Sequence, residues 1–391
     1  MKGLKKAPLT VLIIFFLAMP TIFNCGGNVL KAQNYREEMG ELKGGFFTMK
    51  NMENGETIMR TARIINTGDE YIDSENDLYR VINIEGNIAW ARHVEKIKLN
   101  QVSPSQWFKD TFQWKGAAAE RQQEQVKPPL IGVYHSHGAE SYVPSDGADS
   151  IPEGGGILDV GASFVKALEE HGLKVVHNEE THVPHDAGAY YRSRRTVEEL
   201  LAEGVDVFFD IHRDAVPAEE YLAKVDNEEM VQLQFVVGKQ NQNLEINRSY
   251  AESLKSLTDD IYPKLVKGIF LARGNYNQDM TPLSLLVEVG SHENTKEGAA
   301  ESMTLFADAV ATYYLGPQGR QAQEGAGGTA LRSVLWLVLI AGLVLGVYLL
   351  ISTENTEELR ARISRFFQRE FAELGRGIKQ RDDHGKGGEN E

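Results

Sequence analysis

The stretch VDVFFDIHRDA, residues 205–215, is an apolar run that ends in charged and imidazole side chains. Two other stretches have the same pattern, LIGVYHSHGAESY at 130–142 and LSLLVEVGSHE at 283–293. Short runs rich in Val, Ile, Leu and Phe are typical of strands that are buried on both faces of a sheet. We therefore expect three buried strands with reactive groups at their ends. These groups are His135, His137, Glu140, His212 and Glu288.

Around these runs, residues 128–316 alternate between strand and helix patterns. Helical spacing covers 160–171, 193–203, 247–262 and 295–314, and further strands are expected at 173–177 and 231–237. This alternation predicts an α/β fold, with a mostly parallel sheet and helices on both faces. Ligands of such sheets bind at the carboxyl ends of the strands, where His137, His212 and Glu288 fall.

Residues 33–127 predict a small β-rich unit followed by a linker. The pair Asn54-Gly55 is favoured in tight hairpins, and a second hairpin is expected from strands at 78–84 and 88–94. Residues 69–77 are acidic and predict a turn. No residue of this unit stands out as a candidate for chemistry.

The overall charge and the cysteine count narrow the possible functions. The chain has 391 residues and a net charge of −15, which disfavours binding to a nucleic-acid backbone. Because Cys25 is the single cysteine, no intramolecular disulfide and no cysteine-rich zinc site can form. Any transition metal would have to be held by imidazoles and carboxylates, which suits a catalytic zinc ion.

Two segments have the composition of membrane segments. Residues 1–32 carry basic residues and then an apolar run at 9–23, which predicts a signal peptide or an N-terminal anchor. A polar, Gly-rich tether at 317–332 leads to an uncharged run at 333–351, long enough for a transmembrane helix. Residues 352–391 predict a cytoplasmic amphipathic helix and a disordered tail. The arginines after residue 351 place that side in the cytoplasm, so 33–330 would lie outside the cell membrane.

The spacing of His137 and Glu140, together with His212, predicts a zinc ion with three protein ligands and one position open for water. Glu288 would then act as the general base. Two alternatives are open at this point. His135 shares the strand-end face of His137 and is the other candidate first ligand. Glu288 could instead form a salt bridge with Arg194 or Arg213.

Three residues near these ligands are expected to support them or to contact substrate. Asp210 lies on the same side of its strand as His212 and could hold that ligand in place. Arg213 could meet an anionic part of the substrate. Tyr142 follows Glu140 closely and is assigned to the same supporting group.

Six strings occur here in a fixed order: YHSHGAESY, YYRSRRTVEELL, DIHRDA, FVVG, NYNQD and LLVEVGSHENT. Together they resemble the stage II sporulation protein P family over residues 128–316. The resemblance places the family's metal motifs on 135–140 and 210–214 and its catalytic glutamate on Glu288. Family members are typically anchored by an N-terminal segment, and the run at 333–351 departs from that pattern.

This resemblance implies a zinc-dependent N-acetylmuramoyl-L-alanine amidase, a peptidoglycan hydrolase of the cell wall. It implies work in septal remodelling during forespore engulfment, with stage II sporulation proteins D and M as partners. A zinc carboxypeptidase or endopeptidase acting on stem peptides would use the same metal ligands. A catalytically silent scaffold tethered to the membrane is the alternative from another class.

Overall fold

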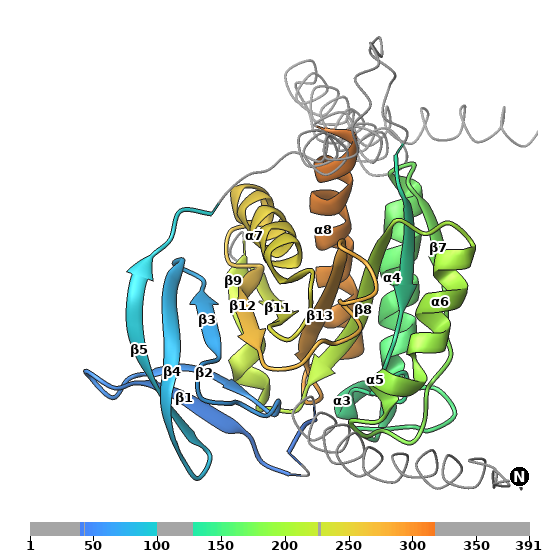
Figure 1. Ribbon diagram of the computed structural model, residues 1–391. Coiled ribbons are helices and arrows are strands. Elements are labelled where there is room, and N and C mark those ends of the chain that lie inside the picture. The colour runs from blue at the N-terminus through green and yellow to red at the C-terminus, as the bar shows by residue number, and fades with distance from the viewer. Residues whose placement is uncertain (1–39, 43, 100–127, 226–227, 317–391) are drawn as a thin grey trace, which may run out of the picture. The chain divides into compact units, whose positions relative to one another are not determined.

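The computed structural model describes residues 40–42, 44–99, 128–225 and 228–316 (Figure 1). The segments predicted as leader, tether, transmembrane helix and tail lie outside these residues, as does the linker after residue 99. Among the residues that the structure describes, no helix combines the length and apolar character needed to cross a bilayer.

Eleven strands form one sheet in the order β2-β1-β5-β4-β3-β12-β11-β13-β8-β6-β7. The strands are β1 (Phe47–Asn51), β2 (Thr57–Thr61), β3 (Glu70–Asp73), β4 (Asp77–Glu85), β5 (Ile88–Lys96), β6 (Leu130–Tyr134), β7 (Lys174–His177), β8 (Val207–Asp214), β11 (Leu233–Gly238), β12 (Val266–Ala272) and β13 (Ser284–Ser291). A separate two-stranded sheet consists of β9 (Leu222–Val225) and β10 (Glu228–Val231).

The part of the large sheet formed by residues 128–316 is mostly parallel, as predicted. Strands β13, β8, β6 and β7 are parallel neighbours, and so are β11 and β12. The pairing of β11 with β13 is antiparallel. Strand β12 was not expected from the sequence.

The strands of the predicted β-rich unit continue this same sheet, at the left of Figure 1. The connection is β3, which pairs antiparallel with β12 and with β4. The stretch 69–77, which the sequence marked as turn-rich, contains a turn but also the strand Glu70–Asp73, which joins the two parts. Both predicted hairpins are present, as β1–β2 and β4–β5.

The helices are α3 (Val143–Asp146), α4 (Gly156–Glu170), α5 (Ala189–Arg192), α6 (Arg194–Ala202), α7 (Leu244–Ile261), α8 (Lys296–Leu315) and a 3₁₀ turn, η1 (Ala218–Tyr221). Gly172 and Gly204 follow α4 and α6 in the left-handed conformation, with φ of 88° at both, which suits the end of a helix. At the start of α8, the hydroxyl of Thr295 accepts the backbone N–H of Gly298.

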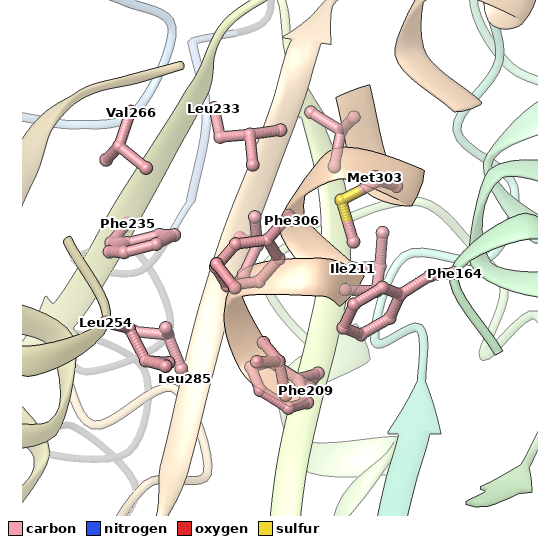
Figure 2. Close-up of a cluster of buried hydrophobic side chains, with 14 of the residues drawn as sticks. Phe164, Phe209, Ile211, Leu233, Phe235, Leu254, Val266, Leu285, Met303 and Phe306 are labelled. Atoms are coloured by element: carbon pink, nitrogen blue, oxygen red, sulfur yellow. The ribbon is translucent and has the colours of Figure 1, made fainter. Parts of the chain in front are cut away.

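Helices cover both faces of the mostly parallel part. Figure 2 shows Phe306 and Met303 of α8 packed among side chains of one face, including Phe209 and Phe235. The opposite face carries Phe208, which packs with residues of α6. Successive residues of β8 point to opposite faces, and all of β8 is buried, so the sheet is covered on both sides.

Candidate metal centre

The carboxylate of Glu140 is the meeting point of three imidazoles. Its Oε1 lies 3.4 Å from His137 Nδ1, 3.3 Å from His212 Nδ1 and 3.5 Å from His185 Nε2. In a tetrahedral zinc site with bonds of about 2.0–2.2 Å, ligand atoms lie roughly 3.4 Å apart. These three distances therefore fit a carboxylate and imidazoles that share one ion.

His137 presents a lone pair to Glu140. Burial lowers the pKa of His137, so its ring is neutral and carries one N–H. The carbonyl oxygen of Asp186 lies 3.0 Å from Nε2 and can only accept, so the N–H is at Nε2. His137 Nδ1 is then unprotonated, and it makes no hydrogen bond although it is buried. A lone pair that faces a carboxylate oxygen is repelled by it unless a cation lies between the two atoms. A metal ion bound to both His137 and Glu140 would be such a cation.

The ring of His212 lies between two carboxylates, those of Asp210 and Glu140. Its Nε2 lies 3.0 Å from Asp210 Oδ1, and its Nδ1 faces Glu140. Burial opposes the charged form, but Asp210 and Glu140 outweigh it and raise the pKa of His212 to about 10. A metal ion at Nδ1 would take the place of that proton. Metal-binding histidines commonly donate their second N–H to a carboxylate, which is the role expected for Asp210.

Ser136 fixes Asp210 and was not singled out in the sequence. Its hydroxyl donates to Asp210 Oδ2 at 2.6 Å, and its backbone N–H donates to Oδ1 at 2.8 Å. Although burial opposes ionisation, His212 and Ser136 lower the pKa of Asp210, so it stays an acceptor. The residue between His135 and His137 therefore supports a ligand on a neighbouring strand.

Glu41 and His185 also lie among the candidate metal ligands, although the sequence did not predict this role for either residue. Ligand atoms of Glu41, His137, Glu140 and His185 all lie within 4.8 Å of one another, and of the predicted ligands this set contains His137 and Glu140 but not His212. These residues and His212 supply more ligands than a zinc ion with an open position uses. His185 and His212 are therefore alternative third imidazoles, and Glu41 is an additional carboxylate.

His135, the alternative first ligand, has both ring nitrogens engaged elsewhere. Its Nδ1 lies 3.0 Å from the carbonyl oxygen of Ile211, and its Nε2 lies 3.0 Å from His177 Nε2. Burial, followed by the charge of His177, lowers the pKa of His135 to about 3. A Cβ at Gly161 would lie 2.5 Å from the His135 ring, so α4 passes closely over it. The geometry favours His137 over His135 as the first ligand.

Glu288 forms a salt bridge, but with a partner that the sequence did not suggest. The Nε of Arg63 donates to Glu288 Oε1, and Arg63 Nη1 donates to the hydroxyl of Tyr190 at 2.8 Å. The expected partners pair elsewhere, Arg194 with Asp279 and Arg213 with Glu140 and Glu41. Neither Arg63 nor Glu288 is more than 1% exposed.

Glu288 keeps one free oxygen and a raised pKa. Its Oε2 is buried without a hydrogen bond. Burial raises the pKa of Glu288 to about 7, although Arg63 acts in the opposite direction. Glu288 is the register partner of His212 in the parallel ladder of β13 and β8, so both side chains leave the sheet on the same face.

A cavity of about 620 Å³ opens beside this group. Its walls combine the segments before β1 and after β2 with the end of β8 and the loops that follow β6, β7, β8 and β13. The lining residues are Gly40, Glu41, Leu42, Gly44, Gly45, Ile64, His137, Asp149, His185, Asp186, Ala187, Arg213, Ala215 and His292. Arg213, expected to meet an anionic group, lies in this wall.

Tyr142 has a structural role in the core. It is 0% exposed, and its hydroxyl donates to the carbonyl oxygen of Val289 at 2.9 Å. This bond ties the loop after β6 to β13. Tyr142 thus supports the strand that carries Glu288 and does not line the cavity.

An α/β sheet whose strand ends gather histidines and carboxylates beside a cavity defines a candidate metal-dependent enzyme. The chain belongs to the stage II sporulation protein P family, whose sequence model matches residues 58–311. The matched range includes Arg63, all three predicted metal ligands and Glu288. Glu41 precedes it.

A curated relative, stage II sporulation protein P of Bacillus subtilis (strain 168), is 29% identical over 216 residues. The match covers 50% of this chain and 54% of the relative, so the chain spans about half the length of that protein.

Similar solved structures include the CwlD amidase from Clostridioides difficile in complex with the GerS lipoprotein, at 18% identity and a TM-score of 0.32, covering 50% of this chain and 98% of that chain. They also include an N-acetylmuramoyl-L-alanine amidase from Clostridium difficile 630, at 12% identity and a TM-score of 0.31, covering 51% of this chain and 99% of that chain.

Proposed function

We propose that the chain is a zinc-dependent peptidoglycan hydrolase that cleaves the amide between N-acetylmuramic acid and the L-alanine of the stem peptide. The observation that carries the proposal is the convergence of imidazole nitrogens on Glu140 Oε1 at 3.3–3.5 Å. Membership of the stage II sporulation protein P family supports a role in sporulation, and we propose septal wall remodelling during engulfment as its setting.

His137, Glu140 and His212 would hold the zinc ion. Each is at most 2% exposed, and Asp210 and Ser136 fix the ring of His212 from behind. When bound, zinc would lower the pKa of a water molecule and polarise the scissile carbonyl. Hydrogen-bonded side chains behind a ligand keep its ring in one orientation, so His212 would present Nδ1 to the ion in a fixed direction.

Glu288 is proposed to accept a proton from the attacking water at Oε2 and to deliver it to the leaving nitrogen. Arg63 holds the other carboxylate oxygen, so the side chain presents one oxygen in a fixed orientation. A pKa of about 7 suits this task, because such a group both accepts and releases a proton near neutral pH.

The location and partners of the enzyme form part of the proposal. We place the cavity on the extracytoplasmic side of the membrane, with the chain anchored by the predicted helix at 333–351. Stage II sporulation proteins D and M are the proposed partners. Protease protection in intact cells tests the placement, because residues 40–316 would be digested from outside only if they lie there.

The test of the activity is a digest of purified peptidoglycan by the zinc-loaded full chain in detergent, followed by mass spectrometry of the fragments. The proposal predicts free lactyl groups on muramic acid and new amino-terminal alanine. The matched control is Glu288→Gln, which keeps the size of the side chain. New peptide ends without free lactyl groups would replace the amidase proposal with a peptidase. If neither product forms beyond the Glu288→Gln control, the chain is not a hydrolase under these conditions and the proposal fails.

A further inference from the structure

A pair of opposite charges, Arg213 and Glu41, faces the cavity beside the candidate metal centre. Arg213 Nη1 lies 3.9 Å from Glu41 Oε2 and 3.9 Å from Glu140 Oε1. Both distances exceed a hydrogen bond. Arg213 Nη1 and Glu41 Oε1 are buried and have no hydrogen-bond partner among the described residues. A guanidinium nitrogen and a carboxylate therefore lie close together beside the cavity without a hydrogen bond between them.

Arg213 is a rigid cation. Its Nε donates to the carbonyl oxygen of Ser141 at 3.3 Å, its Nη2 donates to that of Asp149 at 2.8 Å, and its own backbone N–H donates to Glu140 Oε2 at 2.9 Å. A guanidinium keeps its positive charge at every pH at which proteins fold, so Arg213 is a permanent cation in this wall. Because Nε and Nη2 already donate hydrogen bonds, Nη1 is the nitrogen that can donate to an anion bound in the cavity.

Glu41 is held through its backbone and not through its carboxylate. The N–H of Leu42 donates to the carbonyl oxygen of Ala62 at 2.8 Å, and the N–H of Ile64 donates to that of Gly40 at 3.1 Å. One ligand atom of the carboxylate lies within 4.8 Å of ligand atoms of His137, Glu140 and His185, and Oε1 is buried without a hydrogen bond. It can therefore rotate away while its backbone stays in place.

We propose that Arg213 Nη1 and the metal position beside it form a subsite for a carboxylate of an acidic peptide, and that Glu41 occupies this subsite as an internal competitor. The inference rests on the proposed function and specifies its substrate class. A substrate carboxylate that displaces Glu41 would gain the hydrogen bond that Glu41 does not make. Charge-assisted hydrogen bonds from a buried guanidinium are strong enough to select a carboxylate over a carboxamide.

The test measures binding by isothermal titration calorimetry to the zinc-loaded full chain. The two probes are alanyl-glutamate amide and alanyl-glutamine amide, which differ only in carboxylate against carboxamide. In Glu41→Gln, we expect the carboxylate probe to bind at least about tenfold more tightly than to the unsubstituted chain, with the carboxamide probe changing less than about twofold. Adding Arg213→Met to Glu41→Gln should remove the gain.

The matched control is Asp149→Asn. Asp149 lines the same cavity and is exposed, and it contacts Arg213 through its backbone carbonyl. A tenfold gain in this control as well would mean a general charge effect and would overturn the subsite. Zinc content is measured for every variant, and a loss of zinc in Glu41→Gln would show that Glu41 is a structural ligand, which also overturns the proposal.

The two-probe comparison in Glu41→Gln decides the question even if the double variant does not fold. Equal gains for both probes, or no gain for either, would exclude a carboxylate subsite. Because binding is measured without turnover, a failed peptidoglycan digest would leave this result readable. A carboxylate-selective gain with no digestion would thus separate the subsite from the proposed reaction.

Discussion

Arg63 and Glu288 form a buried ion pair between residues that are 225 positions apart in the chain. Arg63 also forms an antiparallel backbone bridge with Glu41. One short region of the chain therefore supplies both the guanidinium that binds the proposed base and a carboxylate of the candidate metal group. The described residues between 40 and 99 therefore contribute side chains to the candidate site and strands to the same sheet.

Replacing Arg63 should change the pH dependence of catalysis. Arg63 lowers the pKa of Glu288 against the effect of burial, so Arg63→Met removes that influence and the pKa rises above about 7. Because the base must be deprotonated, the acidic limb of the kcat/KM profile should move to higher pH. Arg63→Lys keeps a charge and should restore part of the original profile. An unchanged limb in both variants would separate Arg63 from the base.

The conservative substitution Glu288→Gln should leave zinc in place and lower kcat by about 10²–10⁴-fold, which is the typical contribution of general base catalysis. Zinc content is measured by mass spectrometry and turnover by release of soluble wall fragments. Since Gln keeps the shape of the side chain, a large loss of zinc would mean that Glu288 is a ligand and not the base.

The carboxylate behind His212 should control metal affinity. Asp210→Asn weakens the acceptor for His212 Nε2, so zinc affinity should fall by about 10–100-fold. Competition with a chromophoric chelator measures this change. Asp149→Asn, at an exposed carboxylate of the cavity wall, serves as the control and should change affinity less than about twofold. Equal effects in the two variants would contradict the role of Asp210.

The choice between His212 and His185 as third imidazole has a direct test. His212 is held by Asp210 and Ser136, whereas His185 is partly exposed and its Nδ1 lies 3.5 Å from Ser150 Oγ. We therefore expect His212→Ala to lose stoichiometric zinc and His185→Ala to retain it, as measured by equilibrium dialysis. The opposite result would transfer the ligand role to His185.

The helix-covered face should behave as an ordinary core. Phe306 of α8 contacts Phe164, Phe209 and Phe235 at ring distances of 5.3–6.0 Å. Phe306→Ala should therefore destabilise the protein by about 3–5 kcal/mol, measured by urea denaturation. Leu201→Ala, at an exposed position of α6, is the control and should cost less than about 0.5 kcal/mol. A similar loss in both would argue against this packing.

Local sequence patterns predicted most of the strands and helices that carry the candidate site. The strand expected at 130–134 coincides with β6, and the four predicted helices correspond to α4, α6, α7 and α8 with ends shifted by a few residues. These segments have apolar runs or helical spacing that depend only on neighbouring residues. Strand β12 was missed because its uninterrupted apolar stretch, GIFLA at residues 268–272, is only five residues long.

The sequence could not predict the contributions of Arg63 and Glu41. Both reach the site through long-range contacts, such as that of the Ala62 backbone N–H, which donates to Asp214 Oδ1 152 positions later in the chain. Nothing in the local composition of residues 40–65 indicates a catalytic role. His185 carried only a weak signal, as a histidine in a polar loop, and Ser136 gained its meaning from Asp210 on the neighbouring strand.

The most direct test of the account is anomalous diffraction at the zinc edge from crystals of the zinc-loaded protein. We expect one strong peak within bonding distance of Glu140 Oε1 and His137 Nδ1, with His212 Nδ1 as the third protein ligand. A zinc-loaded crystal with no peak at Glu140, or with the ion bound elsewhere, would contradict the central claim.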